Sequence, residues 1–164
     1  MRAPLPLELV PILAHGRPAD PAIDLGAVPG DVLASTLAVY RAHGFAPPFI
    51  GYLAVAGGRA VGTCAFPAPP AGGRVEIAYY TFPGGEGRGI ATEMARRLVA
   101  LAHGASPPVA VYAHTRPAPG ASARILARLG FACAGLIDHP EDGPLWEWRL
   151  APPAPALPGG RAPR

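Results

Sequence analysis

The stretch VEIAYYTFPGGEGRGIAT, residues 75–92, contains the pattern that decides the fold. Its first half is rich in β-branched and aromatic side chains, which favours a strand over residues 74–82. Glycines follow, and apolar residues at helical spacing begin directly after them. Such an order points successive backbone N–H groups and the positive end of a helix dipole at one place. Residues 85–91 are therefore predicted to form a turn that binds a pyrophosphate.

Two common phosphate loops do not match this turn. A Walker loop ends in Lys followed by Ser or Thr, and the chain contains no Lys. A dinucleotide-binding fingerprint requires Gly-x-Gly-x-x-Gly or Ala. In the register that starts at Gly85 the third small position is Ile90, and in the register that starts at Gly87 it is Thr92. Both alternatives are therefore excluded.

A third pattern matches at two of its three defined positions, Gly89 and Ala91. The segment Glu86-Gly-Arg-Gly-Ile-Ala91 resembles the signature of the GNAT superfamily of N-acetyltransferases, Gln/Arg-x-x-Gly-x-Gly/Ala, with Glu86 in place of Gln or Arg. A second element of that family follows in the same order, namely an expected strand over residues 109–114 and a helix that is headed by Ser122 and ends in a Gly-Phe pair. The resemblance covers roughly residues 50–150.

The resemblance implies acetyl-CoA as the cosubstrate and assigns residues to its parts. Thr81 and Phe82 would offer backbone groups to the pantetheine arm, and Ser122 would border the far side of the cofactor. The pyrophosphate would be held by the backbone amides of the turn, helped by one hydroxyl: Gly87, Arg88, Gly89, Ile90, Ala91 and the side chain of Thr92.

The chain also departs from the family pattern. The family often has an Asn just before the second motif, where this chain has Pro119 and Gly120. It often has a Tyr in that helix as the acid for the departing thiolate, where this chain has Leu126. The acid is therefore not identified. A thiol with an unperturbed pKa near about 8.5 can still leave as a thiolate.

Two residues are candidates for the base that accepts the proton of an amine. Glu76 lies among apolar neighbours on the strand that leads to the glycine turn, where partial burial would raise its pKa. The alternative for Glu76 is a solvated or salt-bridged carboxylate. His114, at the end of the next expected strand, is the rival base or a substrate contact, and its alternative is a structural hydrogen bond.

Other polar and aromatic residues have weaker assignments. The aromatic residues of two expected strands are predicted to pack, with some of them lining the acceptor pocket: Tyr79, Tyr80, Trp146 and Trp148. Glu141 and Asp142 either attract a cationic amine or form a solvated turn.

Composition limits the remaining classes of function. Half of the 164 residues are hydrophobic, 15% are charged, and no apolar run approaches the roughly 18 residues that span a bilayer. We therefore expect a soluble, cytoplasmic protein without an export signal, because prolines and Glu8 interrupt the N-terminus. A net charge of +3, spread along the chain, gives little support for nucleic-acid binding. Cys64 and Cys133 show no metal-ligand pattern and are expected to be buried, reduced thiols.

The expected fold class is α/β of the α+β type, with a mixed, largely antiparallel central sheet flanked by helices. One domain should span residues 1–150, and residues 151–164 should form a disordered tail. Helices are expected to start at Asp31 and Ser122 as capping residues. The remaining elements are an edge strand at 5–13, strands at 49–55, 60–66, 133–137 and 145–150, and a helix at 90–102.

The main functional hypothesis is an N-acetyltransferase that acts on a primary amine by direct attack. The acceptor is either a small molecule or a protein N-terminus; residues 81–83 and the alanine-rich helix resemble the branch that includes ribosomal-protein N-terminal acetyltransferases. The alternatives are a non-catalytic acyl-CoA-binding or sensor module and a structural domain with an empty turn. No membrane, nucleic-acid or metal partner is expected. The acyl-chain preference and the oligomeric state, including a homodimer, stay open.

Overall fold

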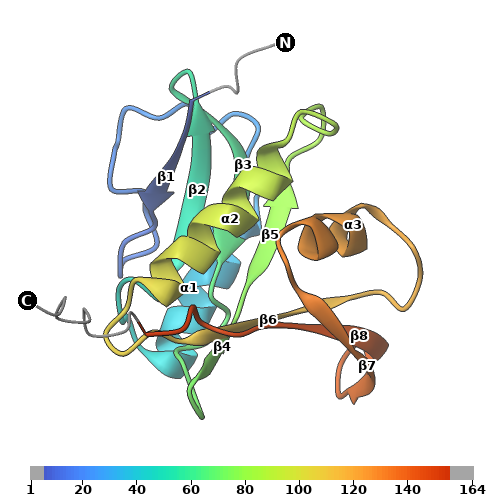
Figure 1. Ribbon diagram of the computed structural model, residues 1–164. Coiled ribbons are helices and arrows are strands. Elements are labelled where there is room, and N and C mark those ends of the chain that lie inside the picture. Colours follow the sequence, from blue (N-terminus) through green and yellow to red (C-terminus); the bar gives the residue numbers. More distant parts are fainter. Residues whose placement is uncertain (1–5, 156–164) are drawn as a thin grey trace, which may run out of the picture.

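The computed structural model describes residues 6–155. This part of the chain forms eight strands and three helices, and Figure 1 labels them. In chain order they are β1 (Leu7–Pro11), α1 (Val32–His43), β2 (Gly51–Ala56), β3 (Arg59–Ala65), β4 (Arg74–Glu76), β5 (Ala78–Thr81), α2 (Ile90–His103), β6 (Ala110–Thr115), α3 (Ala121–Arg128), β7 (Ala132–His139) and β8 (Gly143–Leu150).

The strands form two four-stranded sheets. The first has the order β1-β2-β3-β5 and is antiparallel throughout, with β1 at the edge, as Pro11 within it and Pro6 beside it predict. The second has the order β4-β6-β8-β7, in which β4 and β6 are parallel and the other pairs are antiparallel. The predicted class, a mixed and largely antiparallel α/β fold with flanking helices, is confirmed.

The strand expected over residues 74–82 is divided between the two sheets. Its first part, β4, pairs with β6, and its second part, β5, pairs with β3. Ile77 lies between the parts, is 2% exposed, and its amide donates to the Tyr112 carbonyl at 2.9 Å. The prediction of one continuous strand was wrong because a change of partner leaves no mark on the residue pattern. Beyond Ile77, β5 and β6 diverge (Figure 1).

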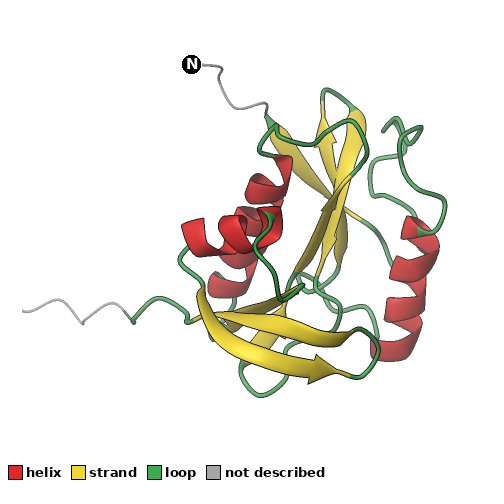
Figure 2. Cartoon of the chain, turned by 90° about the vertical axis from the view of Figure 1, so that its right-hand side faces the viewer, coloured by secondary structure: helices red, strands yellow, loops and turns green. Residues whose placement is uncertain are grey.

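The helices cover both faces of the first sheet. Figure 2 shows α1 on one side and the other two helices on the opposite side. The buried face of α2 carries Ile90, Met94 and Leu98, of which the last two are 0% exposed. Burying such a side chain contributes about 1.5–3 kcal/mol, so this face fixes α2, and the turn before it, against the sheet.

Both predicted side-chain caps were wrong. Asp31 precedes α1 and Gly120 precedes α3, and neither helix start has a side-chain capping hydrogen bond. Ser122 lies inside the first turn of α3 rather than before it. The predicted end of α1 is confirmed, because Gly44 has a φ of 86° and its amide donates to the Tyr40 carbonyl.

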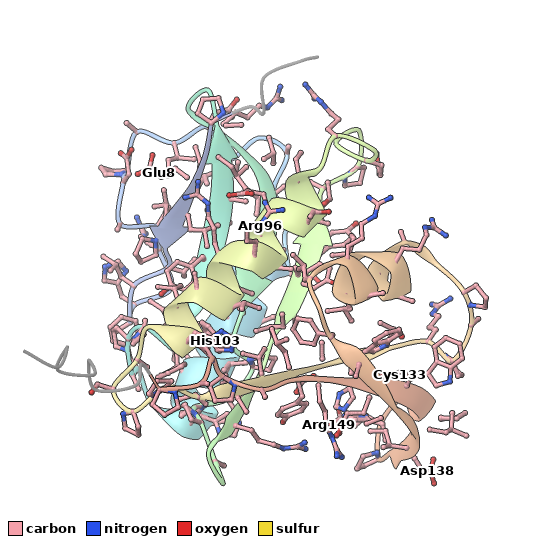
Figure 3. All side chains as sticks on the ribbon, in the orientation of Figure 1. Glu8, Arg96, His103, Cys133, Asp138 and Arg149 are labelled. Atoms are coloured by element: carbon pink, nitrogen blue, oxygen red, sulfur yellow. The ribbon has the colours of Figure 1, made fainter. Side chains whose placement is uncertain are left out.

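The cysteine prediction is confirmed for one residue and wrong for the other. Cys64 on β3 is 2% exposed, and burial raises its pKa to about 12. Cys133 is exposed, because it lies on β7 at the edge of the second sheet (Figure 3). Both thiols are free.

The C-terminal segment is only partly described. Residues 151–155 have no regular secondary structure, and residues 156–164 of the expected tail lie outside the described residues. Within residues 6–155, no helix combines the length and apolarity needed to cross a membrane.

Candidate functional site

The glycine turn connects β5 to the first residue of α2, as the sequence predicts. Gly87 and Gly89 have φ values of 71° and 79°, in the left-handed region that side chains other than glycine rarely adopt. Gly89 is the residue directly before the helix. The strand-to-helix connection can therefore follow this tight path because these two positions lack a Cβ atom.

The amides of this turn are available to a ligand. Among the hydrogen bonds of residues 6–155, none uses the backbone N–H of residues 87–92. The first amides of a helix have no partner within it and carry the positive end of its dipole. The turn exposes Arg88 as well, so a cationic side chain accompanies the free amides. This arrangement suits a pyrophosphate.

Glu86 departs from the family signature, and the structure gives it a role. Its carboxylate accepts a hydrogen bond from the Gly84 amide at 2.8 Å. The side chain therefore stabilises the turn by a hydrogen bond to its backbone. The negative charge is exposed to solvent, which weakens its repulsion of an anion bound nearby.

Some backbone N–H and C=O groups of β5 and of the adjoining Phe82 form hydrogen bonds within the fold, and others have no partner there. The Phe82 amide donates to the Val61 carbonyl at 3.0 Å, and the Phe82 carbonyl accepts from the Gly85 amide at 3.1 Å, so Phe82 has no free amide for a ligand. Backbone groups alternate in direction along a strand. Those of Thr81 and Tyr79 therefore point away from β3. Because β5 is an edge strand, they point toward the side where β6 diverges.

The two rival base candidates contact each other. The Nδ1 atom of His114 lies 3.1 Å from the Glu76 carboxylate, and the Nε2 atom lies 3.4 Å from the carboxylate of Glu147. The strand register explains the arrangement: Glu76 lies beside Tyr112 across the parallel pair, and His114 lies directly opposite Glu147 across the antiparallel pair. We call the three residues the His114 cluster.

Two arginines complete the surroundings of Glu147. Arg74 donates to its carboxylate at 3.0 Å and Arg149 at 2.6 Å. Burial raises the pKa of Glu147, but the hydrogen bonds from Arg74, Arg149 and His114 outweigh it and lower the value to about 2. The side chain is 6% exposed, and this low pKa keeps its carboxylate negatively charged at neutral pH.

Glu147, Arg74 and Arg149 were missed at the sequence level. Glu147 lies between two tryptophans on an expected strand, and alternation with aromatic residues was the signal that could have placed it on one face with His114. The turn that contains Glu141 and Asp142 lies near the His114 cluster. His139 accepts hydrogen bonds from the amides of both residues. The ring centroid of His139 is 5.8 Å from that of His114.

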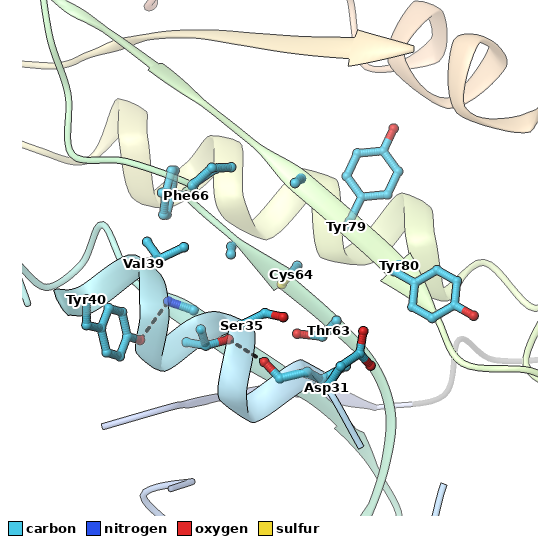
Figure 4. A pocket seen from close by; sticks show the side chains of 15 residues that line it. Asp31, Ser35, Val39, Tyr40, Thr63, Cys64, Phe66, Tyr79 and Tyr80 are labelled. Carbon is cyan, nitrogen blue, oxygen red and sulfur yellow. Dashed lines mark hydrogen bonds between the residues drawn. The ribbon is translucent and has the colours of Figure 1, made fainter. Parts of the chain in front are cut away.

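A pocket of about 300 Å³ lies between α1 and the face of the first sheet (Figure 4). Its walls are largely apolar and include Val39, Phe66, Ala78 and Tyr80. Asp31, Ser35 and Thr63 add polar groups. Ala78, Tyr79 and Tyr80 of the pocket wall belong to β5. The pocket therefore reaches the strand that connects Glu76 to the glycine turn. In the described part of the chain, no group of three or more His, Cys, Asp and Glu residues could hold a metal ion.

Some of the remaining aromatic side chains pack in the interior, and others are exposed to solvent. Trp148 is 9% exposed, and its indole N–H donates to the Thr115 hydroxyl at 3.0 Å. Trp146 packs edge-on against it at 6.4 Å between ring centroids. Tyr80 is 51% exposed and lines the pocket. The expectation that most of these rings pack and some line a pocket agrees with this arrangement.

A family model described as an acetyltransferase (GNAT) domain matches residues 32–132. The match spans more than half of the 164 residues. The chain belongs to the GNAT acetyltransferase family. A comparison with curated proteins finds no match.

Solved structures agree with the GNAT fold. RimL, a ribosomal L7/L12 alpha-N-protein acetyltransferase in its apo form, is 16% identical, with coverage of 88% of this chain and 92% of that chain and a TM-score of 0.64. The protein yncA from Salmonella typhimurium, solved with its cofactor acetyl-CoA, is 21% identical, with 79% of each chain covered and a TM-score of 0.61. An N-acetyltransferase from Staphylococcus aureus Mu50 is 20% identical, with 62% of this chain and 66% of that chain covered and a TM-score of 0.53.

Proposed function

We propose that this GNAT domain transfers an acetyl group from acetyl-CoA to a primary amine by direct attack. One observation supports the proposal: Glu76, which lies 3.1 Å from His114 of β6, stands before the free backbone edge of β5, and the turn with free amides follows that strand. Residues 74–89 would thus connect the proton acceptor Glu76 to the cosubstrate site.

The turn and β5 would hold the cosubstrate. The amides of Gly87 to Ala91, with Arg88 and the Thr92 hydroxyl, bind the pyrophosphate at the start of α2. Thr81 offers its outward-facing backbone groups to the pantetheine arm, and Phe82 contributes a buried wall rather than a free amide. Ser122 borders the far side from α3. When bound, acetyl-CoA supplies the thioester that the amine attacks.

The His114 cluster would remove the amine proton. Glu76 is partly accessible, with 27% of its side chain exposed, and accepts the proton first. A neutral imidazole carries one N–H, whereas a protonated imidazole donates from both nitrogens, so His114 can pass the proton on while it lies between two carboxylates. Glu147 keeps its charge and fixes the ring of His114.

The pocket beneath α1 would receive the body of the acceptor. Its apolar walls and its volume of about 300 Å³ favour an amine that carries a compact apolar group, either as a small molecule or as the first residue of a peptide. The surface around it carries Asp31, which is exposed and attracts a cationic acceptor before it loses its proton.

Release of free thiol from acetyl-CoA in the presence of a library of primary amines tests the proposal. The substitution Glu76→Gln should lower kcat by about 10²-fold, in the range typical of a lost general base. Glu8→Gln, an exposed carboxylate on β1 (Figure 3), is the matched control and should leave kcat unchanged. Full activity of Glu76→Gln would assign proton removal to His114 or to water.

The sensor alternative makes a different prediction. A sensor is stabilised by acetyl-CoA in thermal unfolding, and not by ATP or NAD, but releases no thiol with any amine. A structural domain shows neither effect. The two measurements together separate the three hypotheses.

A further inference from the structure

The pocket beneath α1 has two chemically different ends. Figure 4 shows Asp31, Thr63 and Tyr80 on one side of the pocket and Val39 and Phe66 on the other. The length of α1 separates the two ends, because Asp31 directly precedes the helix and Val39 lies about 12 Å farther along its axis. A ligand that fills the pocket therefore contacts a polar end and an apolar end.

The pairing of β3 with β5 gives the pocket a direction relative to Glu76. Thr63 pairs with Tyr80 at the polar end, and Ala65 pairs with Ala78 toward the apolar end. Glu76 precedes Ala78 by two residues and therefore lies on the apolar side. Extended backbone rises about 3.3 Å per residue, so Glu76 and Tyr80 are separated by up to about 13 Å along the chain. The proposed proton acceptor and the polar end thus lie at opposite ends of an apolar stretch.

Asp31 is the one charged residue in the wall of this pocket, as far as the structure describes the chain. Among residues 6–155, its carboxylate forms no ion pair and no hydrogen bond, and the capping bond to α1 is absent as well. Asp20 and Asp24, in the same connection between β1 and α1, each accept a hydrogen bond at 2.8 Å from the amide two residues farther along. The Asp31 carboxylate is therefore free to pair with a cation that enters the pocket.

A molecule with two amines would use both ends of the pocket. The amine that attacks the thioester must be neutral, and its proton goes to Glu76 on the apolar side. A second alkyl amine in the same molecule keeps its proton at neutral pH, since its ordinary pKa lies near about 10. This ammonium group would pair with Asp31, and the carbon chain between the two amines would contact Val39 and Phe66.

We propose that Asp31 selects acceptors that carry a second cationic group, and that the acceptor is a linear diamine with an apolar spacer. This inference rests on the proposed function. The neutral amine near Glu76 attacks the thioester: the C–N bond forms, the C–S bond breaks, coenzyme A leaves as a thiolate with the electron pair, and the amine proton passes to Glu76. The far ammonium group keeps its proton and its contact with Asp31 throughout.

Octylamine and octamethylenediamine test the proposal, because they differ only in the second amine. The measured quantity is the ratio of kcat/KM for the diamine to kcat/KM for the monoamine, corrected for the two equivalent amines of the diamine. The wild type should favour the diamine about fivefold, which is the upper range for an exposed ion pair. Trimethylenediamine is too short to reach both ends and should show no such preference over propylamine.

Variants of Asp31 assign the preference to this carboxylate. Asp31→Asn should lower the ratio to about one, because the ion pair is lost. Asp31→Glu keeps the charge and should retain most of the preference. Asp20→Asn, which changes an exposed carboxylate outside this pocket, is the matched control and should keep the wild-type ratio.

Ionic strength distinguishes an ion pair from a change in the shape of the pocket. Salt screens exposed charges, so the wild-type ratio should fall as sodium chloride is added, whereas the ratio of Asp31→Asn should not respond. Equal ratios in the wild type and Asp31→Asn at low salt would overturn the inference. If no primary amine is acetylated, the proposed function fails. If octylamine and octamethylenediamine react equally well, only this inference fails.

Discussion

At the scale of single residues, Glu147 determines how the polar face of the second sheet is organised. It is buried, and three hydrogen-bond donors surround its carboxylate. Removing one partner from a buried ionic group leaves the other partners uncompensated, which costs more than the interaction itself contributes. The orientation of His114, and through it the contact with Glu76, thus depends on a residue that lies outside the proposed proton path.

Glu147→Gln should therefore lower the free energy of unfolding at neutral pH by about 2–3 kcal/mol. Urea unfolding of the wild type and the variant measures the difference. Glu141→Gln, in the exposed turn between β7 and β8, is the control and should change stability by less than about 0.5 kcal/mol. Equal losses in both variants would show that Glu147 has no special role.

The same carboxylate predicts a dependence of stability on acid. Its pKa in the folded protein lies near 2, below the ordinary value of 4.5. A group with a lowered folded-state pKa stabilises the fold fully above its ordinary pKa, and the contribution disappears as the pH falls from 4.5 toward 2. Wild-type stability should decline over this window, and Glu147→Gln should show a shallower decline. Parallel curves for the two proteins would assign the acid sensitivity to other groups.

At the scale of elements, the divided strand shows what the sequence predicted and what it did not. Residues 74–82 are apolar and β-branched enough to predict extended backbone, and the following glycines predict the turn and the start of α2. The change of partner at Ile77 depends on where β3 and β6 lie, which is set by residues far away in the chain. The same is true of the His114 cluster, because three strands supply its members.

The glycine turn gives a prediction for this element. Gly89→Ala should cost about 1 kcal/mol in stability, because its φ of 79° is unfavourable for a residue with a Cβ atom. It should also weaken acetyl-CoA binding about tenfold by displacing the amides before α2. Gly57→Ala, at a φ of 56° in the β2–β3 hairpin, is the matched control. It should lose similar stability and keep its affinity in a calorimetric titration. Equal affinity in Gly89→Ala would contradict the assignment of the turn.

The pocket beneath α1 gives a second prediction at this scale. Ala78→Leu places a larger side chain at an exposed position of the pocket wall and should raise the KM for the acceptor about tenfold. The Kd for acetyl-CoA should not change. Ala100→Leu, at an exposed position on α2 outside this pocket, controls for the substitution itself. Steady-state kinetics with varied acceptor distinguishes the two, and an unchanged KM in Ala78→Leu would place the acceptor elsewhere.

At the scale of the whole molecule, the sequence pattern predicted which elements form, whereas tertiary contacts determine the helix starts and the exposure of single residues. The fold class and most element positions followed from periodicity, glycines and prolines. The capping roles of Asp31 and Ser122 were wrong, because a helix start can be fixed by packing and backbone geometry alone. The burial of Cys133 was wrong because alternation does not reveal that a strand lies at an edge. The cytoplasmic location stays a prediction.

We propose that residues 74–89 connect the acetyl-CoA site to Glu76, which removes the amine proton together with His114 of β6. The most direct measurement incubates the wild-type protein with acetyl-CoA and a set of primary amines that carry compact apolar groups, and quantifies both free thiol and acetylated amine by mass spectrometry. The two products should appear in equal amounts, and only when protein and amine are both present. Binding of acetyl-CoA without acetylated amine for any member of the set would contradict it.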